Sequence, residues 1–458
     1  MKKYKVLVAL SIMLATLANA QWLETTVAVG SNPFALCWNS TNNKVYCANW
    51  GSDNVTVIDG ATNSVDTTIA VGIEPHDLCW NSTNNKIYCA NCGSNNIMII
   101  DGATNSVDTT IAVGNEPWVL CWNSTNNKIY CANNDGDNVT VIDGATDSVI
   151  TTVAVGSNPR ALCWNSISNK VYCLNEQSDN VTIIDGVSNS IDTTVAVGSY
   201  PWTLCWNSTS NKVYCSNYIS SNVTVIDCAT DSVIATVAVG GFPMGLCWNS
   251  TNNKVYCANY LSNDVTVING ATDSVDTTVV VGSDPFALLW NLNNNKVYCA
   301  SWGSDDVTII DGVTDSVITT VAVENDPCDF CWNSVQNRTY VANFNSSSVS
   351  VIRDTLLGVE EQLTFNIQRP TVKIYPNPFH DEVHISFGIG YGTESVELSI
   401  YNAAGRLVES FRITPDALRT TLFWDGTDHA NRQLPSGVYF VILHTRDCII
   451  TEKLLLIR

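Results

Sequence analysis

The stretch FALCWNSTNNKVYCANWGSDNVTVIDGATNSVDTTIAVG, residues 34–72, decides the fold of most of this chain. Its β-branched and aromatic runs alternate with clusters of Asn, Asp, Gly and Ser, which predicts four short strands joined by tight turns. A four-stranded antiparallel meander of this kind forms one blade of a β-propeller. The predicted strands cover about residues 34–38, 45–48, 55–58 and 65–71.

The same unit occurs eight times with a constant spacing of 42 residues. A Pro-x4-Trp pair marks each copy, from Pro33 and Trp38 in the first to Pro327 and Trp332 in the last. Only seven outer strands lie between the eight copies, and LETTVAV at 23–29 matches the missing one. We therefore predict an all-β fold, an eight-bladed propeller of four-stranded blades closed by this N-terminal strand.

The turn residues fit this prediction. Asn43 and its seven equivalents end the first turn of every blade. A three-residue hairpin loop needs a left-handed residue at that position, and Asn tolerates a positive φ. Asp59 and Gly60 begin the third turn, where the Asp side chain can accept hydrogen bonds from the backbone of its own turn.

Both ends of the chain differ from the repeat. Three lysines within the first five residues precede an apolar run and Ala18-Asn19-Ala20, the pattern of a secretory signal. No later stretch has the roughly 20 consecutive apolar residues of a membrane-spanning helix, so we expect no transmembrane anchor. The expected domains are a signal peptide at 1–20, the propeller at 21–354, a linker at 355–369 and an Ig-like β-sandwich at 370–458.

Two family resemblances follow from these motifs. Tyr46-Cys47-Ala48-Asn49 and Asn54-Val55-Thr56-Val57-Ile58-Asp59 resemble the signature of YVTN-type β-propeller repeats. That resemblance covers about residues 21–354 and implies a fold and a location outside the cytoplasm, because the family has no common activity.

The C-terminal segment carries the second resemblance. Tyr375-Pro376-Asn377-Pro378-Phe379, Gly405-Arg406-Leu407-Val408 and Leu434-Pro435-Ser436-Gly437-Val438-Tyr439 resemble the C-terminal sorting domain of type IX secretion cargo. The resemblance implies contact with the export machinery and transfer across a bacterial outer membrane. The expected location is therefore secreted or on the outer cell surface, after signal peptide cleavage.

Paired cysteines recur in six copies, one in the first strand and one ten residues later in the second. If the hairpin turns about its central Asn, the two lie opposite each other and could form a disulfide in an exported protein. The alternative is that they are small buried thiols that pack between blades. The pairs are Cys37 and Cys47, Cys79 and Cys89, Cys121 and Cys131, Cys163 and Cys173, Cys205 and Cys215, and Cys247 and Cys257.

Function is expected where the copies differ, because variable side chains on a repetitive frame form the binding surfaces of such proteins. The residue after each proline and the first residue of the second turn vary, and many are aromatic. Those rings either form a binding surface or pack between blades. The candidate ligand-binding residues are Trp50, His76, Trp118, Arg160, Trp202, Tyr218, Tyr260 and Trp302.

The sequence favours a non-enzymatic protein that recognises a glycan or another protein through this aromatic face. Only His76 of the five histidines lies in the propeller, so we name no catalytic residue and no metal ligand. A net charge of −21 argues against nucleic acid as a partner. Two alternatives stay open: a hydrolase or lyase that uses Glu74 and Glu116, with calcium as its one candidate cofactor, and a structural surface-layer component.

Overall fold

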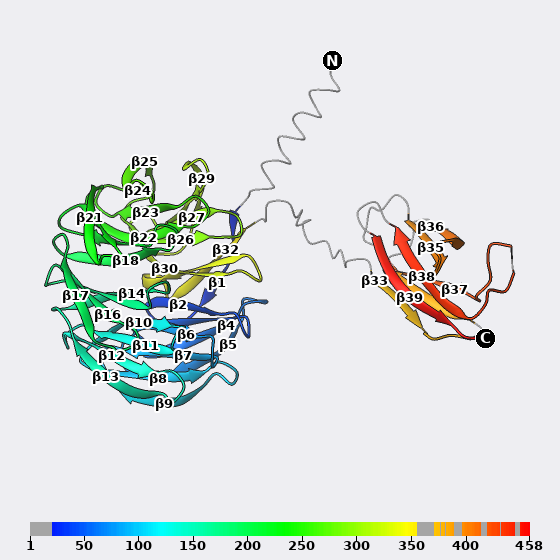
Figure 1. The fold of residues 1–458 in the computed structure, drawn as a ribbon, viewed down its shortest axis with the longest axis horizontal. Coiled ribbons are helices and arrows are strands. Elements are labelled where there is room, and N and C mark those ends of the chain that lie inside the picture. The colour runs from blue at the N-terminus through cyan, green and yellow to red at the C-terminus, as the bar shows by residue number, and fades with distance from the viewer. Residues whose placement is uncertain are drawn as a thin grey trace, which may run out of the picture. The chain divides into compact units, whose positions relative to one another are not determined.

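The computed structural model describes residues 21–354 and most of the C-terminal segment: 371–375, 377–380, 382–388, 396–413, 419–430, 432–444 and 449–458. The chain forms two compact units, residues 1–359 and 360–458 (Figure 1). The expected signal peptide at 1–20 and linker at 355–369 lie outside the described residues. No helix among the described residues is long and apolar enough to cross a membrane.

The first unit is the predicted ring of eight four-stranded antiparallel sheets (Figure 1). Each of the first seven blades takes four consecutive strands, and the first strand of each blade contacts the first strands of its neighbours on the inside of the ring. The first four blades are β2 (Pro33–Asn39), β3 (Lys44–Asn49), β4 (Asn54–Asp59), β5 (Val65–Ala70); β6 (Pro75–Asn81), β7 (Lys86–Asn91), β8 (Asn96–Asp101), β9 (Ser106–Ala112); β10 (Pro117–Asn123), β11 (Lys128–Asn133), β12 (Asn138–Asp143), β13 (Ser148–Ala154); β14 (Pro159–Asn165), β15 (Lys170–Asn175), β16 (Asn180–Asp185), β17 (Ile191–Ala196).

The remaining blades continue the series without interruption. They are β18 (Pro201–Asn207), β19 (Lys212–Asn217), β20 (Asn222–Asp227), β21 (Ser232–Ala238); β22 (Pro243–Asn249), β23 (Lys254–Asn259), β24 (Asp264–Asn269), β25 (Ser274–Val280); β26 (Pro285–Asn291), β27 (Lys296–Ser301), β28 (Asp306–Asp311), β29 (Val317–Ala322); and β30 (Pro327–Asn333), β31 (Arg338–Asn343), the 3-10 turn η1 (Phe344–Ser346) and β32 (Ser348–Asp354).

The ring closes as the sequence predicted. Strand β1 (Gln21–Ala28) pairs antiparallel with β32, from Gln21 opposite Asp354 to Ala28 opposite Ser348. The last sheet therefore has the order β1-β32-β31-β30 and combines the two ends of the propeller sequence. This arrangement gives the last blade a full set of four strands.

The turns explain both a confirmed prediction and a wrong one. Asn43 and its seven equivalents all have a positive φ, between 49° and 56°, as predicted. The predicted three-residue loop is wrong, because Asn39 pairs with Lys44 and leaves four residues in the turn. This shifts the register by one residue relative to a hairpin centred on Asn42.

That shift contradicts the geometry expected for the disulfides. Cys37 lies opposite Tyr46, and Cys47 lies opposite Leu36, so the two sulfurs point to opposite faces of the sheet. The same register holds in the other five blades with paired cysteines. All twelve paired cysteines are free thiols, and burial raises the pKa of Cys37 to about 12. They therefore fill space in the blades as the alternative reading proposed.

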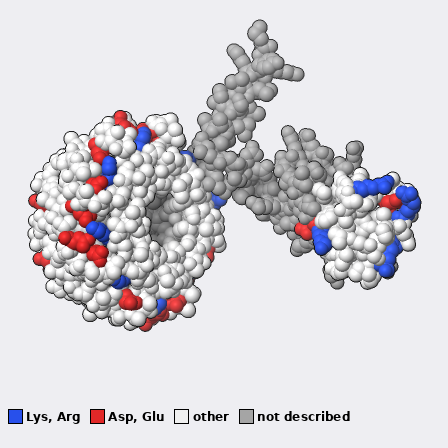
Figure 2. Space-filling model, viewed as in Figure 1, with Lys and Arg blue, Asp and Glu red and all other residues white. Residues whose placement is uncertain are grey.

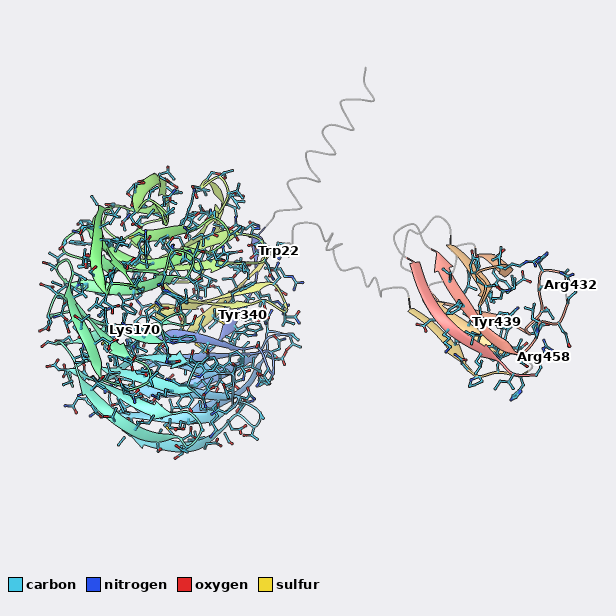
Figure 3. All side chains as sticks on the ribbon, in the orientation of Figure 1. Trp22, Lys170, Tyr340, Arg432, Tyr439 and Arg458 are labelled. Carbon is cyan, nitrogen blue, oxygen red and sulfur yellow. The ribbon has the colours of Figure 1, made fainter. Side chains whose placement is uncertain are left out.

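Adjacent blades are held together by apolar and polar contacts that repeat around the ring. Tyr46 and Val57 of the first blade share a buried cluster with Ile87 and Cys89 of the second. The hydroxyl at seven of the eight Tyr46-type positions reaches the third turn of the next blade; Tyr340, labelled in Figure 3, donates to Asn63 Oδ1 at 2.8 Å. Tyr298 donates instead to Asp354 at the end of β32. One such apolar cluster lies between each pair of neighbouring blades, so every blade is packed on both faces.

Ion pairs repeat at the edge of the same blades. Lys170, labelled in Figure 3, lies 2.5 Å from Asp231 of the next blade and 2.9 Å from Asp192. Lys212 contacts Asp273 at 2.7 Å in the same way. Figure 2 shows blue and red side chains next to one another on the rim of the propeller. Most of the positive charge in the repeats is therefore paired.

The second unit contains two small antiparallel sheets, as predicted for a β-sandwich. Their facing side chains form one core that includes Phe379, Ile385, Leu398, Trp424 and Val441. The first strand of the unit was not predicted from the sequence. The sheets are β33 (Thr371–Tyr375), β34 (Val383–Gly388) and β37 (Arg419–Trp424), and β36 (Leu407–Ile413), β35 (Val396–Asn402), β38 (Gly437–His444) and β39 (Ile449–Leu456).

Candidate functional site

Two kinds of loop meet at one end of every blade. The amide of the first residue after the second strand donates to the carbonyl of the residue before the proline, as Trp50 does to Asn32 at 2.9 Å and Trp302 to Asp284 at 2.9 Å. The same bond occurs in all eight blades. It places the two variable positions of each blade beside each other at the same end of the ring.

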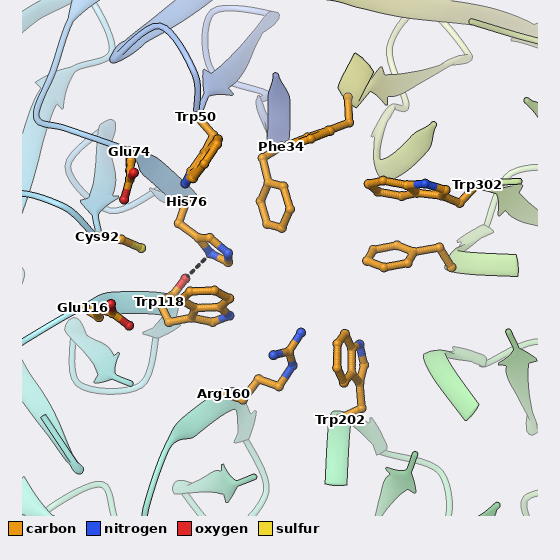
Figure 4. Close-up of a pocket in the computed structure, with 12 residues that line it drawn as sticks. Phe34, Trp50, Glu74, His76, Cys92, Glu116, Trp118, Arg160, Trp202 and Trp302 are labelled. Carbon is orange, nitrogen blue, oxygen red and sulfur yellow. Dashed lines mark hydrogen bonds between the residues drawn. The ribbon is translucent and has the colours of Figure 1, made fainter. Parts of the chain in front are cut away.

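These loops surround a pocket of about 360 Å³, shown in Figure 4. Most of its wall is aromatic, and the Phe and Trp rings are only half-buried, whereas His76 is buried. The lining residues come from seven of the eight blades, so the pocket belongs to the ring as a whole. They are Phe34, Trp50, Glu74, His76, Cys92, Glu116, Trp118, Arg160, Trp202, Phe286, Trp302 and Phe344.

The rings contact one another around the wall. The His76 ring centroid lies 4.3 Å from that of Phe34 and 3.8 Å from that of Trp118. On the other side, Trp302 lies 5.3 Å from Phe286 and 5.6 Å from Phe344. Each ring is held in place by its neighbours, which leaves the remaining faces available to a ligand.

Arg160 adds a positive charge that packs against two of these aromatic rings. Its guanidinium lies 3.3 Å from the ring centroid of Trp202 and 5.7 Å from that of Trp118. Glu176 neutralises it through a contact of 3.3 Å between Nη1 and Oε2. Burial lowers the pKa of Arg160, against the opposing effect of Glu176. The sequence singled out Arg160 but not its partner, which occupies a variable position in the same blade.

His76 is a neutral side chain in the pocket wall. Burial lowers its pKa to about 3, against the effect of its hydrogen bond to Trp118, and the charge of Arg160 lowers it further. Nδ1 lies 2.8 Å from the Trp118 carbonyl oxygen. A carbonyl only accepts, so Nδ1 carries the proton and Nε2 keeps its lone pair.

The comparisons with known proteins fit the two units of the structure. Residues 3–166 match the family of YNCE-like β-propellers, and residues 373–457 match the secretion system C-terminal sorting domain. The chain combines a YNCE-like β-propeller with a C-terminal sorting domain. Such a domain implies a secreted or cell-surface protein that interacts with a secretion machinery. None of the curated proteins compared with this chain matches it significantly.

Solved structures share the propeller fold at low sequence identity. Sqt1 of Saccharomyces cerevisiae is 11% identical with a TM-score of 0.65, over 73% of this chain and 99% of that one. Hydrazine synthase of Kuenenia stuttgartiensis is 16% identical with a TM-score of 0.53, over 73% and 98%. The dihydro-heme d1 dehydrogenase NirN, in complex with DHE, is 10% identical with a TM-score of 0.58, over 88% and 80%. These similarities show the fold alone.

The YNCE-like propeller brings together six of the eight residues proposed from its sequence. Trp50, His76, Trp118, Arg160, Trp202 and Trp302 all line the pocket. Tyr218 and Tyr260 are not among the lining residues. Tyr218 instead stacks on Phe242 at 4.4 Å, with its ring 5.4 Å from Trp202. It supports the pocket wall from outside.

The sequence proposal left out Phe34, Phe286 and Phe344 of the propeller as site residues. All three occupy the same two variable positions as the tryptophans. The signal that could have identified them is therefore repeat position, not residue type. Across the described residues, no group of three or more His, Cys, Asp and Glu side chains is arranged to hold a metal ion.

Two half-buried carboxyls link neighbouring blades next to the pocket residues. Asp77 Oδ2 accepts a hydrogen bond from the Leu120 amide, and Asp329 Oδ2 accepts one from the Leu36 amide, both at 2.7 Å. Burial raises the pKa of each carboxyl to about 7, although these amide bonds lower it. Their ordinary value is 3.8. The folded protein thus binds more protons than the unfolded chain between about pH 4 and pH 7.

This difference predicts a pH-dependent stability. The contribution of Asp77 and Asp329 is fully present below about pH 4 and is lost as the pH rises to about 7, because the folded state must then bury two charges. We expect Asp77→Asn/Asp329→Asn to raise the Tm above that of the wild type by a few degrees more at pH 8 than at pH 5, at about 2 °C per kcal/mol. Thermal unfolding at both pH values measures this. An equal Tm difference at pH 5 and pH 8 would contradict it.

Proposed function

We propose that this protein is a secreted or surface-displayed binding protein whose propeller recognises a glycan through the pocket. The observation that carries the proposal is the wall of half-buried aromatic rings around a volume of about 360 Å³. In this proposal residues 1–20 direct the chain out of the cytoplasm. The sorting domain then delivers the propeller to its place of action.

The size and shape of the site favour a small ring or chain end over a broad protein surface. Pockets for small molecules typically have volumes of about 300–1,000 Å³. A stable protein partner instead covers about 800 Å² on each side, over a wide patch. A pocket of about 360 Å³ fits one end of an oligosaccharide.

The chemistry of the wall also suits a sugar. The flat faces of Trp50, Trp118 and Trp302 can pack against the C–H face of a pyranose, which buries apolar area at low entropic cost. His76 Nε2 offers an acceptor to a hydroxyl. The guanidinium of Arg160 uses Nη1 with Glu176 and has further N–H donors for sugar oxygens. Both kinds of polar contact that a hydroxyl needs are therefore present.

The test is binding to a glycan array, followed by titration of each glycan that binds. We expect Trp118→Ala/Trp202→Ala to weaken binding by about 100-fold, because truncating a central aromatic anchor typically costs more than 2 kcal/mol. Tyr260→Ala is the matched control: it removes an aromatic ring from a loop of the same kind outside the pocket. Equal losses in the two variants, or the absence of any binding glycan, would contradict the proposal.

A further inference from the structure

Two carboxylates in the pocket wall have no cation beside them. Glu74 and Glu116 line the pocket from neighbouring blades, and neither side chain makes an ion pair or a hydrogen bond with any described residue. Burial, Asp135 and then Glu74 raise the pKa of Glu116. The nearby Arg160 is already paired with Glu176. The pocket therefore carries negative charge that no residue of the described chain neutralises.

A buried acceptor in the same wall also lacks a partner. His76 is only 8% exposed, and its Nδ1 is used by the Trp118 carbonyl. Nε2 has no hydrogen-bond partner among the described residues, yet it is not sealed from solvent. This acceptor is therefore open to a hydrogen bond from a donor on the ligand.

The backbone at the two glutamates is unusual for this residue type. Glu74 and Glu116 have φ values of 57° and 50°, in the left-handed region. Asn and Asp occupy that position in four of the other blades and tolerate it better than Glu. Tyr200 and Phe242 adopt the same conformation at this position in the remaining two blades, with φ values of 57° and 55°, so the left-handed backbone belongs to the repeat, and each long side chain held there costs roughly 1 kcal/mol or more. The four blades are those of Asn32, Asn158, Asp284 and Asp326.

The aromatic wall itself accepts a cation. The Arg160 guanidinium lies on the face of Trp202 at 3.3 Å, which shows that ring faces in this pocket can carry positive charge. Uncompensated carboxylates, an unpartnered acceptor and cation-binding rings all suit one chemical group. That group is an ammonium, which donates three hydrogen bonds and accepts none.

We propose that the glycan bound here carries protonated amino groups, as an oligosaccharide of glucosamine does, and that Glu74 and Glu116 bind the ammonium with His76 as an acceptor. This inference rests on the proposed glycan-binding function. It adds the chemical class of the sugar and the two residues that select it. No bond is made or broken in this step.

Three tetrasaccharides test whether the pocket selects an amino sugar or binds any glycan of this shape. They share the β-1,4 linkage and differ only at C2: glucosamine has an ammonium, N-acetylglucosamine a neutral amide, and glucose a hydroxyl. Calorimetric titration of the full chain at pH 6 and low salt is expected to show at least 10-fold tighter binding of the glucosamine tetramer than of the other two. The preference should shrink at 0.5 M salt, where charges are screened.

The variant Glu74→Gln/Glu116→Gln keeps the shape and the backbone conformation while removing both charges. It is expected to bring the ratio of the glucosamine and glucose affinities to about one. Asp284→Asn/Asp326→Asn is the charge-matched control, because it removes two carboxylates at the same repeat position in blades that do not line the pocket with that residue. The control is expected to keep the preference.

The possible outcomes test the amino-sugar inference separately from the proposed glycan-binding function. Equal binding of all three tetramers by the wild type, or an equal loss of preference in both variants, would overturn the amino-sugar inference and leave glycan binding in place. Binding of none of the three, together with no binding on the array, would overturn both. Circular dichroism of each variant shows that a change in binding is not a loss of the fold.

Discussion

Replacing Asp354 by alanine is expected to lower the free energy of unfolding by about 3 to 5 kcal/mol, the usual cost of leaving one charge of a buried pair alone. Asp354 is the last residue of β32, and its side chain is completely buried. Its Oδ1 lies 3.6 Å from Nζ of Lys296, which is itself only 2% exposed. Its Oδ2 accepts hydrogen bonds from the Tyr298 hydroxyl and from Asn291 Nδ2.

The pKa values of Asp354 and Lys296 show that each charge is stabilised by the other. Burial raises the pKa of Asp354 to about 6 although Lys296 opposes the shift, and burial lowers the pKa of Lys296. Burial disfavours the charged form of each group, and the charge of its partner offsets part of that cost. In Asp354→Ala, the Lys296 ammonium has no counter-ion and Tyr298 loses its acceptor, so the cost exceeds that of a lost surface pair.

Chemical denaturation of the propeller and of each variant measures this free energy of unfolding. Asp66→Ala is the control. Asp66 pairs with Lys44, which holds the same repeat position as Lys296, but both are partly exposed at 30% and 20%. The control is expected to lose only about 0–1 kcal/mol. Adding Lys296→Met to Asp354→Ala should recover part of the loss. Equal losses for Asp354→Ala and Asp66→Ala would contradict the prediction.

Replacing Arg338 by alanine is expected to cost about 3 kcal/mol and to loosen the closing strand. Arg338 Nε lies 2.7 Å from Oε2 of Glu24 on β1, and Nη2 lies 2.5 Å from Oε1. Its Nη1 donates to the carbonyls of Gly60 and Ala61 in the first blade, at 2.7 and 2.9 Å. One side chain thus joins the last blade, the closing strand and the first blade.

The geometry of this contact predicts that a lysine at position 338 will not restore the interactions of Arg338. Lysine occupies the Arg338 position in the other seven blades, yet it lacks the planar fork that binds a carboxylate through two hydrogen bonds. We expect Arg338→Lys to recover only part of the stability. Hydrogen exchange of the β1 amides should be faster in Arg338→Ala than in the wild type, while exchange in β14 to β17 stays unchanged. Uniform acceleration across the ring, or none in β1, would contradict a local role in closure.

The residues that repeat predicted the fold, whereas those that vary did not predict the site completely. The 42-residue period and the match of residues 23–29 to an outer strand were enough for eight closed blades, because strand pairing follows from alternation and turn chemistry. The loop length of one turn was not predictable from Asn43 alone, since a left-handed residue ends loops of three and of four residues. The one additional residue in this turn shifted the register, so that the two cysteines of each expected pair no longer lie opposite each other.

The sequence by itself determined the blade, the number of blades, the closing strand and the positions at which the copies differ, because these depend on local patterns and their periodicity. Only the tertiary structure decided which variable residues meet. Tyr218 and Trp202 hold different variable positions in one blade, yet Trp202 lines the pocket and Tyr218 packs behind it. Likewise, the partners of His76 and Asp354 come from the packing of neighbouring blades, which brings together residues far apart in sequence, while burial shifts their pKa values.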